Sequence, residues 1–438
     1  MRSPLNLCST MKIFTLCFVI TVSVFALTAL PTIALAQEGA QPATAAPGEP
    51  LTLSDALARA LLKNPSLQAY AFEARVAEAR VLQAGIRPNP EVSLGFENAL
   101  GTGALSGVKG LETTLQLSQL IDLGGSRARR TETAESERTL AEADYEAKRI
   151  GVLAEVARRF IEAAADEARL SAAVRARELG EQTVAAVRKR VEAAVSSPLD
   201  LHKARTALAR LQIDEEHAEH ELAAHRQSLA AVLGENEPRF GATQADLLRL
   251  PDIPELSALA ARLEKSPVLA RFAIEARWRE AQIRLAQSLR RSGARVSAGL
   301  RRVENTDDFG LIAGVSIPLP MRDEQAGSLR EARERRAQLS ASAEAMRLEM
   351  QATLFDVYQE MLHARTALNQ LQQEVIPLAE ESLALAGQGY RDGRFSLLEL
   401  LDAQKSLIEL RSHAVAYATT FHLHVIEIER LLGAPFQG

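Results

Sequence analysis

Apolar residues recur at helical spacing over most of the chain. Between positions 125 and 198 only Gly151 and Gly180 interrupt a run of strong helix formers. This pattern predicts one helix of about 70 residues, which at about 1.5 Å per residue would extend about 105 Å. A second very long helix is predicted over 328–390, with a kink at Pro377, because proline cannot continue the helical hydrogen bonds.

Shorter helices flank each long one. The pattern predicts helices of about 35 residues over 54–86 and 255–291, and another of similar length after each long helix and its turn. We call these two turns the tips and expect them near 195–198 and 391–396. The chain is therefore predicted to be mainly α-helical and to contain two long helical hairpins.

Alternation with a period of two marks four short segments, near 91–98, 111–120, 295–302 and 309–317. In the first, Val92, Leu94 and Phe96 alternate with small or polar residues. Such segments are typical of transmembrane β-strands with the apolar side outward, although a half-buried soluble hairpin gives the same alternation. Four strands cannot close a barrel, since the smallest have about eight, and lipid does not tolerate open edges. If these strands span a membrane, several chains must share one barrel.

The two halves of the chain resemble each other. Asn64-Pro65 returns as Ser266-Pro267, and Leu233-Gly234 returns as Leu432-Gly433, about 200 residues later. This offset is far longer than a solenoid unit and indicates duplication of a whole half. We predict a first repeat, a linker, a second repeat and a C-terminal tail, over 51–234, 235–254, 255–433 and 434–438.

Composition agrees with long helices rather than a thick core. Of 438 residues, 47% are hydrophobic but only 4% are aromatic, which argues against a compact enzyme with an aromatic core. The formal charge of −5 does not favour a nucleic-acid surface, so no nucleic-acid partner is expected. Cys8 and Cys17 are the two cysteines, and both lie close to the N-terminus.

The N-terminus has the pattern of a secretory leader. Residues 1–36 hold no acidic residue, contain a long apolar run and end in Ala34-Leu35-Ala36, which predicts a cleaved signal peptide. The alternative is an uncleaved membrane anchor, and translation from Met1 or from Met11 fits equally. After cleavage the chain would hold no thiol and would begin with a flexible segment over 37–50.

The histidines offer little chemistry. His220 and His225 are five positions apart, whereas a helical zinc-protease motif needs four. His217 and His220 share a helix face and are candidate metal ligands, as are His422 and His424, but we interpret all four as solvated side chains. No combination of nucleophile, base and orienting residue is evident, so we predict neither an enzyme nor a cofactor.

The duplicated plan resembles the TolC family of outer-membrane efflux factors over nearly all of 51–433. The segments Arg87-Pro88-Asn89-Pro90-Glu91 and 117–125 (LSQLIDLGG) are similar to its heavy-metal, CzcC-like branch, found in tripartite RND pumps. The resemblance implies a homotrimer in the cell outer membrane, in contact with its lipid. Twelve shared strands would form one β-barrel, and the helices would continue it as an α-barrel through the periplasm. It further implies two partners, a periplasmic adaptor (membrane fusion) protein and an inner-membrane RND pump.

By the same resemblance, the tips constrict the tunnel at its periplasmic end. Two acidic lumen positions of the family fall on Glu399 and Asp402, one helical turn apart. In a trimer they would form two rings of three carboxylates, which attract cations and hinder anions. Crowding of like charges is expected to raise the pKa of some of these carboxyl groups.

The resemblance also implies a latch between the hairpins. A family tyrosine bonds to an aspartate of the neighbouring hairpin, and Tyr390 and Asp200 occupy those positions. Phe395 stands where the family often has an arginine, and Ala194 where a glycine is usual, so the latch is expected to differ here. Adaptor contacts are expected at the tips, on Ala193, Ala194, Val195, Gly393, Arg394 and Phe395.

Together these features predict a passive exit duct that carries substrates, heavy-metal cations by the resemblance, from the periplasm or cytoplasm to the exterior. The alternatives are a periplasmic coiled-coil adaptor or scaffold without a pore, a secreted enzyme, and an efflux channel for drugs rather than metals. An adaptor would show one hairpin beside β-rich domains, not two copies that each carry two amphipathic strands.

Overall fold

The computed structural model describes residues 48–291, 293–319 and 322–435. The predicted signal peptide over 1–36, with Cys8 and Cys17, lies outside the described residues. So do most of the predicted N-terminal segment 37–50 and the last three residues of the predicted tail.

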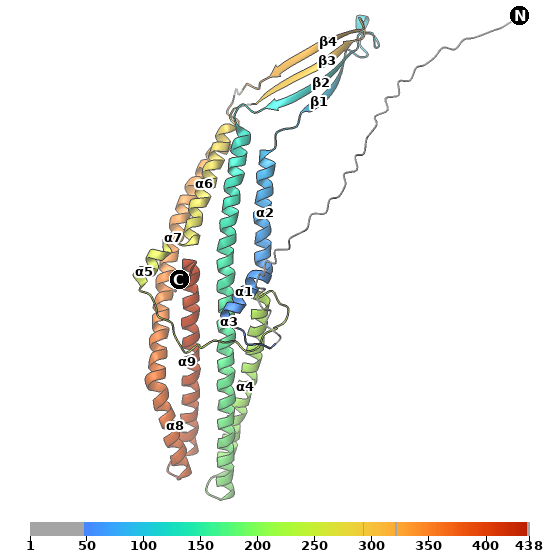
Figure 1. Cartoon of the computed structure of the whole chain (residues 1–438). Coiled ribbons are helices and arrows are strands. Elements are labelled where there is room, and N and C mark those ends of the chain that lie inside the picture. The colour runs from blue at the N-terminus through green and yellow to red at the C-terminus, as the bar shows by residue number, and fades with distance from the viewer. Residues whose placement is uncertain (1–47, 292, 320–321, 436–438) are drawn as a thin grey trace, which may run out of the picture. The chain divides into compact units, whose positions relative to one another are not determined.

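The first half of the described chain contains four helices, one short 3₁₀ turn and two strands (Figure 1). In chain order they are α1 (Leu53–Lys63), α2 (Pro65–Gly85), β1 (Glu91–Glu97), η1 (Gly103–Leu105), β2 (Glu112–Ile121), α3 (Ser126–Glu192) and α4 (Pro198–Val232). The strands β1 and β2 therefore lie in sequence between the short helices α1 and α2 and the very long helix α3.

The second half repeats this order. It consists of α5 (Leu256–Leu263), α6 (Pro267–Ser288), β3 (Ala294–Val303), β4 (Asp308–Ser316), α7 (Ala326–Gln370), the π-helical segment η2 (Leu371–Val375), α8 (Ile376–Arg391) and α9 (Leu397–Leu432). The predicted fold class, mainly α-helical with a small antiparallel sheet and duplicated hairpins, is confirmed.

Two predictions about the helices are wrong. The expected single helix over 54–86 breaks between α1 and α2, because Asn64 is extended (φ −63°, ψ 118°) in front of Pro65. The Asn64 side chain accepts a hydrogen bond from the backbone N–H of Leu67 at 3.1 Å and so caps α2. The expected helix over 255–291 is likewise broken, with Ser266 capping α6 in front of Pro267.

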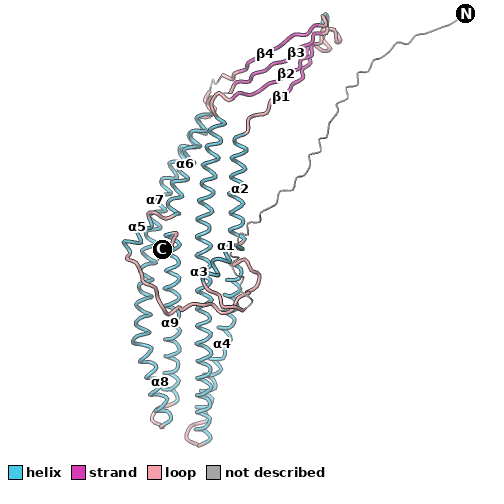
Figure 2. The backbone as a smooth tube through the Cα atoms, viewed as in Figure 1, coloured by secondary structure: helices cyan, strands magenta, loops and turns pink. Residues whose placement is uncertain are grey.

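The sheet joins the two halves of the chain. Its strand order is β1-β2-β3-β4, all antiparallel, so the central β2–β3 pair links the first repeat to the second (Figure 2). The register aligns apolar side chains across all four strands, as in the row Leu94, Leu115, Leu300 and Leu311. Each of these four leucines is more than half exposed, so one face of the sheet presents a continuous apolar surface.

The opposite face of the sheet is polar and ion-paired. Arg301 on β3 contacts Glu112 at 2.7 Å, Glu97 at 3.2 Å and the Thr114 hydroxyl at 3.0 Å. Arg295, six residues earlier on the same strand, pairs with Glu91 on β1. Such cross-strand pairs fix the register and separate a polar face from an apolar one, as the alternation predicts.

The helices pack lengthwise on α3. It contacts α4, α2, α6 and α9, while α7 packs on α9 (Figure 1). Small side chains fill these seams, for example Ala163, Ala164 and Ala165. Among the described residues, only Phe160 and Phe421 bring aromatic rings into the fully buried set. Close seams of alanine explain how so few aromatic residues suffice. No helix among the described residues has both the length and the apolar character needed to cross a membrane.

The long helices of the two hairpins differ in continuity. Helix α3 is continuous over 67 residues, whereas its counterpart is divided by the π-helical segment Leu371–Val375, which ends two positions before Pro377. Because Pro377 has no N–H to donate, the helical hydrogen-bond ladder must be rearranged at the predicted position of the kink.

Candidate functional site at the helical tips

The two tips have the same local architecture. Each turn places one residue in the left-handed region, Ala194 (φ 57°) and Gly393 (φ 75°), and each following helix begins with a capping box. Glycine adopts this conformation freely, whereas alanine pays about 1–2 kcal/mol for it. The first tip is therefore the more strained of the two, at the position where the sequence departs from the expected glycine.

The predicted constriction residues lie at the start of α9. Glu399 and Asp402 are both exposed and are separated by three positions, so they share one face of the helix. The Glu399 carboxylate accepts hydrogen bonds from the Ser396 backbone N–H at 2.6 Å and from the Ser396 hydroxyl at 2.8 Å. These hydrogen bonds lower the pKa of Glu399, because they favour its charged form. Within one protomer the shift is therefore opposite to the rise expected from crowding.

Within one protomer, Tyr390 and Asp200 do not bond to each other, and a latch between them in the trimer stays a prediction. Among the described residues, the Tyr390 hydroxyl has no hydrogen-bond partner, although the side chain is only 4% exposed. The Asp200 carboxylate instead accepts the backbone N–H of Ser197 at 3.2 Å. Asp200 is thus the cap of α4, in the same role that Glu399 has in α9, and no Tyr390–Asp200 bond forms within this chain.

Arg190 joins the two tips, although the sequence did not predict it as a site residue. Its guanidinium lies 4.8 Å from the centre of the Tyr390 ring and donates to the carbonyl oxygens of Tyr390 at 2.8 Å and Arg391 at 3.0 Å. It also donates to the Ser196 hydroxyl at 3.2 Å. Comparison of the two repeats points to this residue. When Asp200 is aligned with Glu399, Arg190 aligns with Gly389, so the two tips differ at this position.

A small apolar cluster supports this contact. It contains Tyr390 and buried residues of both hairpins, namely Val184, Val187, Ala204, Ala386, Leu397 and Leu400. Beside it, the buried Gln404 donates to the Thr183 hydroxyl at 2.7 Å, a second polar link between α9 and α3. The two hairpins of one protomer are therefore packed together close to their tips.

The predicted adaptor-contact residues lie in the turns and are exposed. They are Ala193, Ala194, Val195, Gly393, Arg394 and Phe395. Phe395 is 44% exposed, and its ring lies against Gly389, where an added Cβ would be 2.2 Å from the ring carbon Cδ2. Glycine at this position therefore lets the phenyl ring fold back onto α8.

No group of three or more histidine, cysteine, aspartate or glutamate side chains in the described part of the chain is arranged to hold a metal ion. His217 is exposed and lies 3.4 Å from Glu221, one turn along α4. His225, in contrast, contacts the buried Asp166 of α3 through its Nδ1 atom, so it has a packing role between α3 and α4. His220 stays a prediction as a metal ligand.

Comparison with known proteins identifies the family. The sequence pattern of the outer membrane efflux protein family matches the chain twice, over residues 56–235 and 244–434. The chain belongs to this family. One match falls in each half of the chain, and the predicted recognition as an outer-membrane efflux factor is confirmed.

Curated relatives are metal-resistance proteins of bacteria. The chain is 30% identical to the cobalt-zinc-cadmium resistance protein CzcC of Cupriavidus metallidurans over 384 residues, which cover 88% of this chain and 90% of that protein. It is 27% identical to the nickel and cobalt resistance protein CnrC of the same organism, over 70% of this chain and 72% of that protein.

Solved structures with the same fold are outer-membrane channels. CusC superposes with a TM-score of 0.73 at 19% identity, covering 87% of this chain and 92% of its own. The outer membrane protein VceC of Vibrio cholerae gives a TM-score of 0.71 at 19% identity, covering 88% and 97%. At these identities the likeness establishes the fold.

Family membership decides the class of function. The chain is an outer-membrane efflux channel that extends into the periplasm, as predicted. The family and the relatives are efflux channels rather than enzymes, and neither a scaffold without a pore nor a secreted enzyme is supported.

Proposed function

We propose that this protein is the trimeric exit duct of a tripartite pump that exports divalent heavy-metal cations. The observation that carries the proposal is the 30% identity to a cobalt-zinc-cadmium resistance protein over most of both chains. In this arrangement a periplasmic adaptor contacts the tips and an inner-membrane RND pump supplies the energy. The duct itself holds no cofactor and conducts passively.

The sheet supports sharing of one barrel among three chains. Each chain contributes four strands, whose apolar face is exposed and whose outer strands β1 and β4 have unpaired edges in the single chain. Three copies would supply twelve strands, would pair these edges and would present the apolar face to lipid.

The acidic tip supports passage of cations. Glu399 and Asp402 are exposed on the first turns of α9, and the lowered pKa of Glu399 keeps it charged at periplasmic pH. Three copies around a narrow opening would concentrate six carboxylates there, which favours divalent cations and disfavours anions. The cargo would be bound only transiently, because a conduit must release what it attracts.

Two measurements test the proposal. A strain lacking its own metal-efflux channel should regain cobalt, zinc and cadmium resistance with this protein, provided that the cognate pump and adaptor are present. In planar bilayers, the purified trimer should favour cations, and Glu399→Gln/Asp402→Asn should lower the cation-to-anion permeability ratio several-fold, about 1 kcal/mol.

The matched control removes two exposed carboxylates of the other helices of the same hairpin. Glu349→Gln/Glu381→Gln changes the net charge by the same amount, and we expect it to leave the permeability ratio unchanged. Restored resistance to drugs without resistance to metals would overturn the proposed cargo. An unaltered permeability ratio in Glu399→Gln/Asp402→Asn would overturn the proposed role of the tip.

A further inference from the structure

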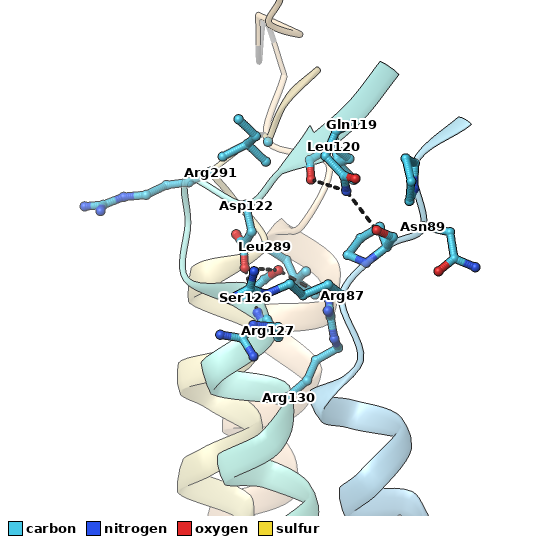
Figure 3. A pocket seen from close by; sticks show the side chains of 14 residues that line it. Arg87, Asn89, Gln119, Leu120, Asp122, Ser126, Arg127, Arg130, Leu289 and Arg291 are labelled. Atoms are coloured by element: carbon cyan, nitrogen blue, oxygen red, sulfur yellow. Dashed lines mark hydrogen bonds between the residues drawn. The ribbon is translucent and has the colours of Figure 1, made fainter. Parts of the chain in front are cut away.

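A cavity lies where the sheet meets the helices (Figure 3), at the end of α3 that is opposite the tips (Figure 1). Its volume is about 880 Å³, and its walls come from the segment after α2, the end of β2, the start of α3 and the segment after α6. The polar lining residues are Arg87, Asn89, Gln119, Asp122, Ser126, Arg127, Arg130 and Arg291.

The cavity is strongly basic in a chain that is acidic as a whole. Four arginines and a single carboxylate, Asp122, line it, which gives a local charge of +4 − 1 = +3 against −5 for the chain. None of these four guanidinium groups forms an ion pair with a carboxylate of the described residues. Arg80 nearby differs, because it pairs with Glu137 at 2.6 Å.

The only carboxylate that lines the cavity, Asp122, accepts hydrogen bonds from the start of α3. Asp122 accepts the backbone N–H groups of Gly124 at 3.0 Å and Arg127 at 2.7 Å, and the Ser126 hydroxyl at 3.0 Å. These bonds hold the start of α3, and no guanidinium of the described residues donates a hydrogen bond to Asp122. The charge of the arginines is therefore not compensated from within this part of the chain.

Three of the arginines come together. In Figure 3 the side chains of Arg87, Arg127 and Arg130 gather below Asp122, while Arg291 points away from them. Arg127 donates to the carbonyl oxygen of Gly85 at 3.4 Å and Arg130 to the Ser126 hydroxyl at 3.3 Å, so neutral acceptors hold both. A second cavity of about 570 Å³ shares Arg87 and Arg130 with the first, so these two side chains face both spaces.

The margin of the cavity is apolar. Leu120, Ile121 and Leu289 line it and are 40%, 45% and 44% exposed. Of the three, Ile121 lies on the same face of β2 as Leu115 and Leu117, so it continues the apolar face of the sheet to the end of that strand. Uncompensated arginines at the edge of an apolar band are the arrangement that receives an anionic headgroup while its acyl chains lie on the apolar surface. Arginine suits phosphate because its planar fork donates two parallel hydrogen bonds.

We propose that this cavity binds a phosphate group, with Arg87, Arg127 and Arg130 as its donors. Two sources carry this chemistry, namely the headgroup of a phospholipid in the surrounding membrane and free inorganic phosphate. The inference uses the outer-membrane location of the family, but not the cargo of the duct. A bound headgroup would offset part of the positive charge of the arginines and hold the sheet end at the membrane surface.

The test uses the full-length trimer purified from outer membranes in mild detergent. Phosphorus per trimer is measured, and bound species are identified by native mass spectrometry. Arg87→Gln/Arg130→Gln should lower retained phospholipid about tenfold, since charge-assisted bonds to phosphate are lost. The matched control Arg205→Gln/Arg210→Gln removes two exposed arginines of α4 and should retain phospholipid like the unaltered protein.

Three probes then distinguish the sources in delipidated trimer. Phosphatidylglycerol, diacylglycerol without phosphate, and inorganic phosphate are each added at equal concentration. Binding of phosphatidylglycerol alone assigns the headgroup, and equal competition by inorganic phosphate assigns the free anion. Equal binding of diacylglycerol, or equal phospholipid retention by Arg87→Gln/Arg130→Gln, would overturn the phosphate site.

Trimer assembly and metal resistance are measured separately for each variant. Migration of unheated trimers on gels shows whether the double variant assembles, and if it does not, the single variants Arg87→Gln and Arg130→Gln are judged by the same criterion. Unchanged phospholipid retention together with intact metal resistance overturns this inference and leaves the proposed function standing. If the unaltered protein fails to restore metal resistance but the double variant still loses phospholipid, the proposed function is overturned and this inference stands.

Discussion

The Arg190 guanidinium lies 4.8 Å from the centre of the Tyr390 ring and donates a 2.8 Å hydrogen bond to the carbonyl oxygen of the same residue. Arg190 lies in the last turn of α3 in the first hairpin, and Tyr390 lies in the last turn of α8 in the second. One side chain therefore ties together two hairpins that are about 200 residues apart in sequence, at the tips.

Arg190→Gln should loosen the closed tip. The substitution removes the cation–π contact and the charge-assisted hydrogen bonds, a loss of about 1–2 kcal/mol for a half-buried group. The equilibrium between closed and open tips would shift about 5–30-fold, and single-channel conductance of the trimer in bilayers should rise. Arg188→Gln, an exposed arginine on the same helix, is the control, and a conductance equal to that of Arg188→Gln would count against the tie.

Tyr390→Phe is expected to behave like the unaltered protein, whereas Tyr390→Ala should open the tip. The hydroxyl has no partner among the described residues, so its removal costs little within the protomer. The ring, in contrast, receives Arg190 and packs in the buried cluster, and its truncation should cost about 3–5 kcal/mol. Conductance of the two variants separates the cases, and a rise in Tyr390→Phe would favour a bond from the hydroxyl to another subunit.

The sequence predicted the parts of the fold that follow from periodicity. Alternation located strands near the observed Glu91–Glu97 and Ala294–Val303, and helical spacing located α3. Periodicity did not reveal the breaks at Asn64 and Ser266, because apolar spacing continues through both. The decisive feature was the proline after each residue, which removes a donor and holds its predecessor extended.

The tip shows where sequence reasoning stops. The positions of Glu399 and Asp402 in the helix follow from their spacing, so their shared face could be predicted. The partner of Tyr390 could not be predicted, because two hairpins meet at the tips and the sequence does not show which of their side chains are in contact. Arginines are common in the last turn of helices, where their charge interacts favourably with the helix dipole, and Arg190 has this position in α3. Nothing in the sequence around it indicated a contact with the other hairpin.

Gly389→Ala should disrupt the second tip. A Cβ at this position would lie 2.2 Å from the Phe395 ring, so the ring must leave the helix or the turn must shift, at about 1–3 kcal/mol. Gly387→Ala is the matched control, because its Cβ would meet only the end of Arg391 at 3.8 Å. Co-purification with the adaptor should weaken in the first variant only, and equal adaptor binding by both would show that the ring position is irrelevant.

The pKa of Glu399 gives a prediction for the pH dependence of cation selectivity. Hydrogen bonds from Ser396 hold this pKa below its ordinary value of 4.5, so the carboxylate stays charged as pH falls through 4.5. Ser396→Ala removes one donor and should move the loss of selectivity to higher pH. Reversal potentials under a salt gradient, recorded from pH 7 to pH 4, report this change.

Asp402→Asn is the companion measurement for this prediction. It leaves only the Glu399 ring at the tip, so the remaining selectivity should follow the titration of Glu399 alone. Loss of selectivity well above pH 4.5 in this variant would mean that crowding in the trimer outweighs the Ser396 hydrogen bonds.

His422 should make the link between α9 and the inter-repeat linker sensitive to acid. Its Nε2–H donates to the carbonyl oxygen of Leu247 at 3.0 Å, and burial lowers its pKa from 6.5 because the charged form loses water. The unfolded chain then binds the proton more readily than the folded chain, so stability is complete above pH 6.5 and falls as pH drops toward the lowered value.

Thermal unfolding of the trimer at pH 7.5 and pH 5.5 checks this sign. The melting temperature should fall on acidification, and the fall should be smaller in His422→Gln, which keeps a donor for Leu247 but does not titrate. His424 is also partly buried with a lowered pKa, so part of the fall should persist in that variant. An identical fall in both proteins would mean that the proton is taken up elsewhere, and greater stability at pH 5.5 would reverse the sign of the linkage.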